Sequence, residues 1–281
     1  MSRVLDLMAQ EGMLVAPGVG DALGALLVVE AGFRAVYMSG YQVSATLGHP
    51  DVGLVTMSEM VDRARSIAEA VEVPLITDAD TGYGSAVNVT RTVRAFERAG
   101  VAGIHLEDQV SPKKCGAMAG RTLVPIPEMT GKIKAALDAR RSNDFLIIAR
   151  TDAIGTEGFE PAIERGQAYR AAGAGAVMVM SPRSREDLAR FRKEVDGPLV
   201  VTMGSWGFDC PVADLRAIGY GLVFYPVSTM RRAVTVVRQL LRELATTGAM
   251  DHSPASMIPM PEMHELLGLA RVQGLDARYG A

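Results

Sequence analysis

Eight short runs of apolar and β-branched residues recur along the chain, and each is separated from the next by a longer mixed stretch. The runs cover residues 13–17, 35–39, 74–78, 103–107, 145–150, 176–180, 199–203 and 222–225. Most mixed stretches place apolar residues three and four positions apart, which is the period of an amphipathic helix. Strands that alternate with helices are typical of βα units around a parallel sheet, and eight such units close a barrel. The pattern therefore predicts an α/β fold, a (β/α)₈ or TIM barrel.

The C-terminal stretch 248–281 has no place in eight βα units. It begins with turn-forming residues and ends in another amphipathic helical pattern. Its apolar positions are Met257, Ile258, Met260, Met263, Leu266, Leu267 and Leu269. On a monomer they would leave an exposed apolar face, which favours packing on another subunit; docking on the chain's own barrel is the alternative. We therefore expect a barrel over residues 1–247 and a helical tail over 248–281 that makes an oligomer contact.

Composition and charge exclude several classes of protein. Of the 281 residues, 48% are hydrophobic and 22% are charged, which is the balance of an ordinary globular protein. The formal charge of −3 supplies no basic field to attract nucleic acid or an anionic membrane. No apolar run reaches the roughly 18 residues of a membrane span, and the N-terminus lacks a signal-peptide pattern, so a cytoplasmic location is expected. Cys115 and Cys210 form no CxxC pair, which argues against a zinc site or a disulfide framework.

Polar residues, with one glycine, close four of the apolar runs. They are Tyr37, Ser39, Gly40, Asp78, Asp80, Glu107, Asp108, Arg150 and Asp152. The strand ends of a barrel gather at one mouth, where the active sites of such folds form. An isolated Asp after a strand is more often a helix N-cap, but Asp78 and Asp80 point the same way because side chains alternate along a strand. Several carboxylates at one mouth favour a bound cation. Mg²⁺, with Mn²⁺ as the alternative, suits an all-oxygen site.

Residues 111–125, SPKKCGAMAGRTLVP, show neither a helical nor a strand period. Segments of this length inside a compact domain are usually functional lids; an ordinary surface loop is the alternative. Lys113, Lys114 and Arg121 would bring positive charge over the acidic mouth. These cations would also favour the thiolate form of Cys115. The segment therefore indicates a small anionic substrate beside the metal.

Five motifs follow one another along the chain: YMSG at 37–40, TDADTGYG at 77–84, HLEDQ at 105–109, PKKCG at 112–116 and IIARTDA at 147–153. In order and spacing they resemble the isocitrate lyase / phosphoenolpyruvate mutase superfamily, in its short branch of methylisocitrate lyases, malate lyases and oxaloacetate decarboxylases. The resemblance runs from about residue 10 to 245. It implies a Mg²⁺-dependent carbon–carbon lyase that acts on a small 2-hydroxy or 2-oxo dicarboxylate through the enolate of pyruvate. It also implies a homotetramer, a dimer of dimers that exchange C-terminal helices.

The same resemblance implies which residues hold the metal and the substrate. Asp80 would bind Mg²⁺ directly, with Asp78 and Glu107 acting largely through its waters. The substrate would lie among Ser39, Gly40, Asp51, Gly116 and Thr202. Of these, Ser39 and Gly40 would hold the carboxylate of the oxo acid.

Four residues would carry the chemistry on this resemblance: Tyr37, Lys113, Cys115 and Arg150. Tyr37 with Arg150 would help to remove the proton from a substrate hydroxyl. Cys115 would protonate the enolate carbon from the segment that covers the site.

Three positions depart from the lyases of this branch. Ala117 stands where they carry His, Met180 where a Glu ends the sixth strand, and Thr202 where they carry Asn. Loss of the Glu and the His removes hydrogen-bond partners for a second carboxylate or hydroxyl, which counts against methylisocitrate as the substrate. Trp206 is expected to form a pocket wall. The alternatives are, in order, an oxaloacetate decarboxylase, a phosphonopyruvate mutase or hydrolase, and a non-catalytic homologue.

Overall fold

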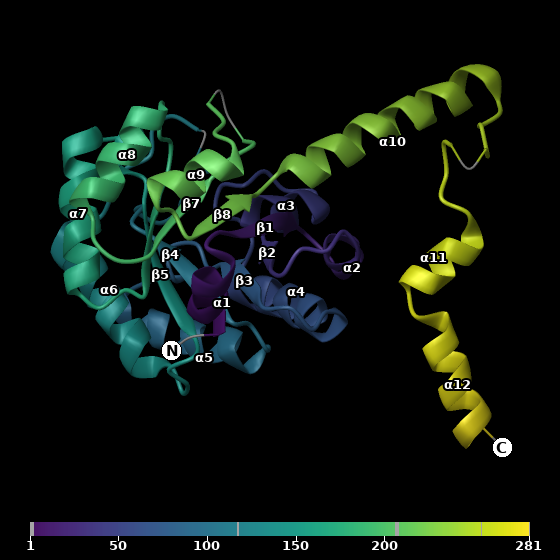
Figure 1. The fold of residues 1–281 in the computed structure, drawn as a ribbon, viewed down its shortest axis with the longest axis horizontal. Coiled ribbons are helices and arrows are strands. Elements are labelled where there is room, and N and C mark those ends of the chain that lie inside the picture. The colour runs from purple at the N-terminus through teal and green to yellow at the C-terminus, as the bar shows by residue number, and fades with distance from the viewer. Residues whose placement is uncertain (1–2, 117, 206–207, 254, 281) are drawn as a thin grey trace.

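A closed barrel of eight parallel strands forms the centre of the molecule. The computed structural model describes residues 3–116, 118–205, 208–253 and 255–280. The strands neighbour one another in chain order, so the crossovers all run to the next strand (Figure 1). They are β1 Leu14–Val19, β2 Val36–Met38, β3 Leu75–Asp78, β4 Gly103–Glu107, β5 Leu146–Thr151, β6 Ala176–Val179, β7 Leu199–Thr202 and β8 Leu222–Tyr225. Each strand end lies within two residues of the predicted run, and the (β/α)₈ barrel is confirmed.

Helices cover the outside of the barrel between successive strands (Figure 1). These are α2 Ala22–Glu30, α3 Gly40–Thr46, α4 Met57–Ala70, α5 Ala86–Arg98, α6 Ile126–Ala139, the 3₁₀ turn η1 Ala153–Gly155, α7 Phe159–Ala171, α8 Arg185–Glu194 and α9 Val212–Ile218. α1 Arg3–Glu11 precedes β1, and α10 Ser228–Thr247, α11 Met260–Leu266 and α12 Leu269–Tyr279 follow β8. Local signals set their limits. Thr56 and Glu59 form a reciprocal capping box at the start of α4, and Gly219, in the left-handed conformation, ends α9.

β1 runs two residues beyond its predicted end at Pro17, through Gly18 to Val19. A Cβ on Gly18 would lie 2.5 Å from the carbonyl oxygen of Pro226, so a glycine is required where β1 passes the residue after β8. Pairing of β1 with both β8 and β2 closes the barrel. The sequence pattern underestimated the strand because it treats Pro and Gly as strand breakers.

Alternate residues of each strand point into the barrel, and this period places the site. The interior is filled by apolar side chains: Leu14, Ala16, Ala35, Ile76, Leu146, Ile148, Ala176, Met178, Val200 and Leu222. Towards the carboxyl ends, the ring of Tyr37 stacks on that of Phe224 with centroids 4.1 Å apart. The last inward positions of β3, β4 and β5 are Asp78, Glu107 and Arg150. A polar layer therefore lies on top of an apolar plug.

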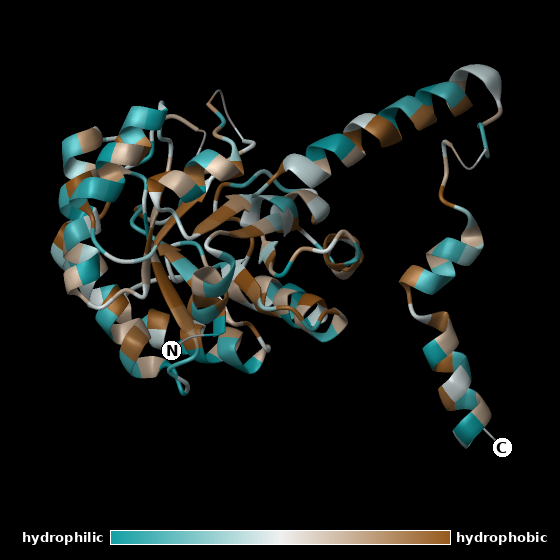
Figure 2. Ribbon diagram, in the orientation of Figure 1, coloured by the Kyte–Doolittle hydropathy of each residue, from teal (hydrophilic) through white to brown (hydrophobic). Residues whose placement is uncertain are grey.

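The C-terminal tail extends away from the barrel, with α10 projecting outwards and α11 and α12 set apart from the strands (Figure 1). None of these three helices contains a buried residue. The apolar residues exposed on α10 are Val234, Val236, Val237, Leu241 and Leu244, and Figure 2 shows hydrophobic positions along that helix. α11 approaches α2. No helix in the described parts of the chain combines the length and the apolar character that crossing a bilayer requires.

Candidate active site

The carboxyl ends of the strands bring most of the predicted site residues around one small cavity of about 30 Å³, roughly the volume of one water molecule in the liquid. Its lining includes Tyr37, Ser39, Asp51, Asp78, Lys113, Cys115, Gly116, Arg150 and Thr202. Asp80 and Glu107 are buried beside the cavity without lining it. Gly40 lies against the Asp78 carboxylate, because a Cβ there would come within 2.7 Å of Oδ2. The predicted residues thus converge at the mouth, although their positions do not test their roles.

Asp78 and Asp80 form the carboxylate pair at the end of β3. The backbone N–H of Asp80 donates to Oδ1 of Asp78 over 2.9 Å. Asp80 has a φ of 46°, a left-handed conformation that Asp adopts more easily than most residues. This turn directs the Asp80 carboxylate back over the mouth, beside the one on Asp78.

Lys113, from the segment 111–125, lies between two carboxylates. Its Nζ is 2.5 Å from Oδ1 of Asp51 and 2.9 Å from Oδ1 of Asp80. All three side chains are buried. The ammonium therefore supplies positive charge inside the carboxylate cluster, and it ties the segment to the mouth.

Glu107 is a buried carboxylate with few partners that could offset its negative charge. Nη1 of Arg150 lies 3.0 Å from its Oε2, but in the described residues neither carboxylate oxygen accepts a hydrogen bond of good geometry. Burial raises the pKa of Glu107 well above its usual range, although Arg150 opposes the shift. Burial likewise raises the pKa of Asp80 to about 6, against the effect of Lys113. Both groups are therefore short of positive charge.

The charges at the described part of the mouth do not balance. The carboxylates are Asp51, Asp78, Asp80, Glu107 and Asp152, and the cations are Lys113, Arg121 and Arg150. If all are ionised, two negative charges are in excess, which is the charge that one divalent cation would neutralise. No three His, Cys, Asp or Glu side chains among the described residues already converge at ligand distance. Mg²⁺ is commonly held in proteins through one or two carboxylates and its own waters.

Tyr37 contacts a histidine that the sequence analysis had not placed in the site. Its hydroxyl lies 2.9 Å from Nε2 of His105. Burial lowers the pKa of His105 to about 4, although Asp78, 3.7 Å away, opposes the shift. Burial raises the pKa of Tyr37 well above its usual value. A neutral imidazole therefore orients a neutral phenol. The sequence offered one signal for His105: it precedes Glu107 by two residues, so both side chains point into the barrel.

The segment that carries Cys115 is packed onto the mouth. Cys115 is buried, is in no disulfide, and its backbone N–H donates to the carbonyl of Asp51 over 3.0 Å. Gly116, on the same segment, lies close to the strand ends, since a Cβ there would come 2.9 Å from Cε of Met180 and 3.1 Å from Nη2 of Arg150. The thiol is thus held next to the cavity, where it can exchange a proton with a bound molecule.

One side of the cavity is apolar. It is lined there by Met178, Met180, Pro226 and Val227. The hydroxyl of Thr202 donates weakly to Sδ of Met180 over 3.4 Å. Met180 and Thr202 are two of the three departures from the family pattern, and both line the cavity with uncharged side chains. Ala117 and Trp206 lie outside the described residues.

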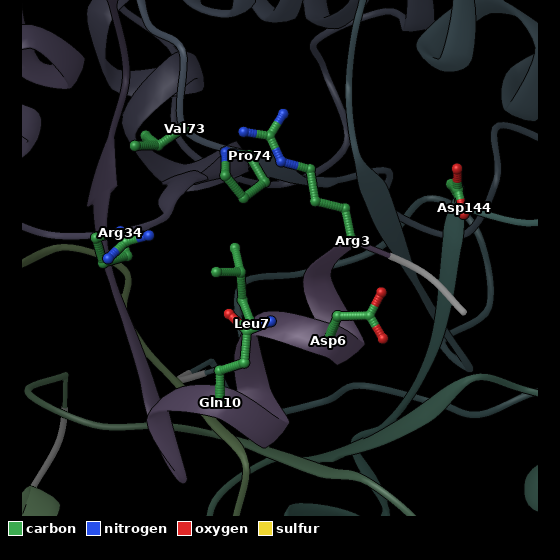
Figure 3. A pocket seen from close by; sticks show the side chains of 8 residues that line it. All are labelled: Arg3, Asp6, Leu7, Gln10, Arg34, Val73, Pro74 and Asp144. Atoms are coloured by element: carbon green, nitrogen blue, oxygen red, sulfur yellow. The ribbon is translucent and has the colours of Figure 1, made fainter.

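A second and larger cavity, of about 430 Å³, lies at the opposite end of the barrel (Figure 3). It is lined by Arg3, Asp6, Leu7, Gln10, Arg34, Val73, Pro74 and Asp144. Pro74 directly precedes β3, so this is the amino end of the strands, whereas active sites of such barrels form at the carboxyl ends. We assign no chemistry to it.

Comparison with known proteins places this geometry among lyases. Residues 4–245 match the family described as phosphoenolpyruvate phosphomutase. The chain is 46% identical to the 2,3-dimethylmalate lyase of Eubacterium barkeri, over 99% of this chain and 97% of that one. It is 41% identical to a 2-methylisocitrate lyase of Aeropyrum pernix, over 97% and 88%. Among solved structures, a phosphonopyruvate hydrolase complex with oxalate and Mg²⁺ has a TM-score of 0.89 and 35% identity, with 99% of each chain covered.

Proposed function

The chain belongs to the phosphoenolpyruvate phosphomutase family, among its carbon–carbon lyases, and we propose that it cleaves a small 2-alkylmalate with the help of Mg²⁺. The observation that carries the proposal is the buried cluster of five carboxyl groups and three cationic side chains, beside a cavity with one apolar wall. The predicted reaction class is confirmed by the relatives. The substrate, the metal and the role of each residue are proposals, and a cytoplasmic location stays a prediction.

Asp80 would bind Mg²⁺ directly, with Asp78 and Glu107 acting through its waters; Mn²⁺ is the alternative ion. Oε1 of Glu107, which is buried and has no hydrogen-bond partner among the described residues, supports this assignment, and so does the Mg²⁺ in the related phosphonopyruvate hydrolase complex. When bound, such an ion polarises the carboxylate and the C2 oxygen of a substrate, which stabilises negative charge that develops there.

The cleavage requires residues of this chain to accept one proton and to donate another. The bond between C2 and C3 breaks, the hydroxyl-bearing C2 becomes the carbonyl of a 2-oxo acid, and C3 leaves with the electron pair. Tyr37, adjacent to Arg150, would take the hydroxyl proton while its own phenol proton passes to Nε2 of the neutral His105, 2.9 Å away. The Cys115 thiol would protonate C3, so that the departing half leaves as a saturated carboxylic acid. Decarboxylation of oxaloacetate would instead leave the charge on pyruvate.

Two further elements would hold the anionic substrate in place. Ser39 directly follows β2 and is the N-cap of α3, where Gly40 would offer a backbone N–H to a carboxylate. Lys113 would neutralise the same end of the substrate. Asp51 and Gly116 would shape the mouth around it, Asp51 by holding Lys113 and Gly116 by letting the covering segment lie close.

The apolar wall selects among possible substrates. A third carboxylate on the departing half would face the apolar side chains of Met178, Met180 and Val227, none of which can pair with it. A small alkyl group would bury favourably there. We therefore propose a dialkylmalate, in agreement with the relative named 2,3-dimethylmalate lyase, over methylisocitrate.

Pyruvate release from a panel of substrates tests this proposal. With Mg²⁺ present, we expect kcat/KM for 2,3-dimethylmalate to exceed that for 2-methylisocitrate by about 100-fold or more. Met180→Glu should reduce the ratio of the two kcat/KM values. Met118→Glu, at an exposed position of the segment 111–125, should leave the ratio unchanged. A preference for the tricarboxylate would contradict the assignment. Absence of turnover on the whole panel, oxaloacetate included, would support a non-catalytic homologue.

We also propose that the tail, residues 248–281, and α10 pack on a second copy of the chain within a homotetramer. Val234, Val237, Leu241 and Leu244 are spaced to form one exposed stripe on α10, and Leu23 and Leu27 are exposed on α2 of the barrel. Together they form an apolar surface that a monomer would leave in water.

Light scattering after size-exclusion chromatography tests the contact. The double variant Val237→Asp and Leu241→Asp should lower the molar mass from an oligomer to a monomer, because a buried unpaired carboxylate costs several kcal/mol. Gln239→Asp, a polar position on the same helix, should keep the wild-type mass. A monomeric wild-type protein would overturn the proposal.

A further inference from the structure

One carboxylate oxygen is shared by two arginines beside the active site. Oδ1 of Asp152 lies 2.6 Å from Nη1 of Arg121 and accepts a 3.1 Å hydrogen bond from Nη2 of Arg150. Oδ2 of Asp152 accepts a second bond from Nε of Arg150 over 2.8 Å. The Asp152 and Arg150 side chains are buried, and that of Arg121 is 6% exposed. Arg121 therefore contacts, through one atom, the same carboxylate that holds a residue of the site.

Asp152 is fixed from below. Its backbone N–H donates to Oδ1 of Asp108 over 3.0 Å, and Oδ2 of Asp108 accepts a 2.8 Å hydrogen bond from the hydroxyl of Tyr169 on α7. Gly155 leaves room for the incoming guanidinium, since a Cβ there would collide with Nη2 of Arg121. The receiving side of the contact is thus a built part of the barrel, whereas Arg121 comes from the segment 111–125.

The shared carboxylate decides how much positive charge Arg150 presents to the cavity. Arg150 faces two carboxyl groups, those of Glu107 and Asp152, and without a further cation Asp152 alone can offset its charge. When Arg121 binds Asp152, it takes up part of that negative charge. Arg150 then keeps positive charge for an anionic substrate in a site of low polarity, where such charges interact strongly.

Access to the cavity links this contact to substrate binding. Lys113, Cys115 and Gly116 of the segment line a space of only about 30 Å³. We therefore expect the segment to move away when a dicarboxylic acid enters, and Arg121, on the same segment, to leave Asp152. On this inference the contact forms when the segment covers the site.

We propose that Arg121 and Asp152 are positioning residues, which hold Arg150 towards the substrate and leave its positive charge available only while the segment 111–125 is closed. The proposal rests on the proposed lyase function for its kinetic part. Its structural part, the latch formed by Arg121, does not depend on that function.

Arg121→Gln tests both parts, because it removes the charge from a side chain of the segment 111–125 and changes no residue of the barrel strands. We expect kcat with the best substrate to fall about 10- to 100-fold, as for a slightly misplaced catalytic group, with KM within about threefold of wild type. Arg121→Lys should restore part of kcat. Lys134→Gln, which removes an exposed cation on α6, should keep kcat within about twofold. Thermal melting confirms that each variant is folded.

A second measurement needs no turnover. Cys115 is buried under the closed segment, so its alkylation by iodoacetamide, followed by mass spectrometry of its peptide, reports opening. In the ligand-free protein, Arg121→Gln should raise the alkylation rate about fivefold or more, with Cys210 as the internal reference. An unchanged rate together with an unchanged kcat would overturn the proposal, and a rise in KM that accounts for the whole loss of kcat/KM would make Arg121 a substrate ligand instead. Faster alkylation in a protein that turns over no substrate would keep the latch and refute the lyase.

Discussion

Asp80→Ala is expected to abolish turnover, by about 1,000-fold or more, and to remove Mg²⁺ binding. Asp80 contributes a buried carboxylate that contacts Nζ of Lys113, next to Asp78 at the end of β3. Its removal takes away the direct ligand and leaves Lys113 paired with Asp51 alone. The chain should stay folded, because the change also relieves repulsion among carboxylates that lack enough positive charge.

Titration calorimetry with Mg²⁺ measures the loss of metal binding, and an assay of pyruvate release measures the loss of turnover. Thermal melting measures stability. Asp80→Asn is the companion variant, because Asn tolerates the left-handed backbone at this position and removes only the charge. Asp62→Asn, exposed on α4, is the control and should behave as wild type. Normal turnover of Asp80→Ala would refute the metal assignment.

Cys115→Ser is expected to lower kcat for 2-alkylmalate cleavage by about 100- to 10,000-fold. Cleavage between C2 and C3 leaves the electron pair on the departing half, which must gain a proton at carbon. A serine hydroxyl is a far weaker acid than a thiol, so it would donate this proton slowly. The substitution keeps the size of the side chain, and the backbone bond from residue 115 to Asp51 does not involve the sulfur.

Parallel assays of the same variant with oxaloacetate distinguish two roles for Cys115, proton transfer to carbon and closure of the segment 111–125. Enolpyruvate from decarboxylation can gain its proton from solvent, so oxaloacetate turnover, where the wild type shows it, should be spared. Equal losses on both substrates would mean that Cys115 serves the closure of the segment, not proton transfer. Cys210→Ser, at a buried position near α9, should leave both rates unchanged.

Several parts of the site could be read from the sequence because they depend on local order. Asp78, Glu107 and Arg150 end consecutive strands, and a period of two carries each of them inward, so parallel closure of the sheet brings them together. The same rule applied to β4 would have placed His105 inside the barrel. The contact of His105 with Tyr37 could not be predicted, because it depends on the register between strands that are 68 residues apart.

The segment 111–125 shows where pattern alone was insufficient. Its composition indicated cations over an acidic mouth, but not which carboxylate each one meets. The structure places Lys113 between Asp51 and Asp80, and Arg121 on Asp152. An irregular segment has no period that relates residue number to direction, so its contacts follow only from packing against the finished barrel.

By itself, the sequence determined the eightfold alternation of strands and helices, the polar strand ends and the family, since each of these rests on spacing between residues that are near in the chain. The tertiary structure alone decided the excess of negative charge at the mouth, the apolar wall at Met180, the carboxylate that Arg121 and Arg150 share, and the outward course of α10. Charge balance and cavity shape depend on distances between residues far apart in the chain, and only closure of the barrel sets those distances.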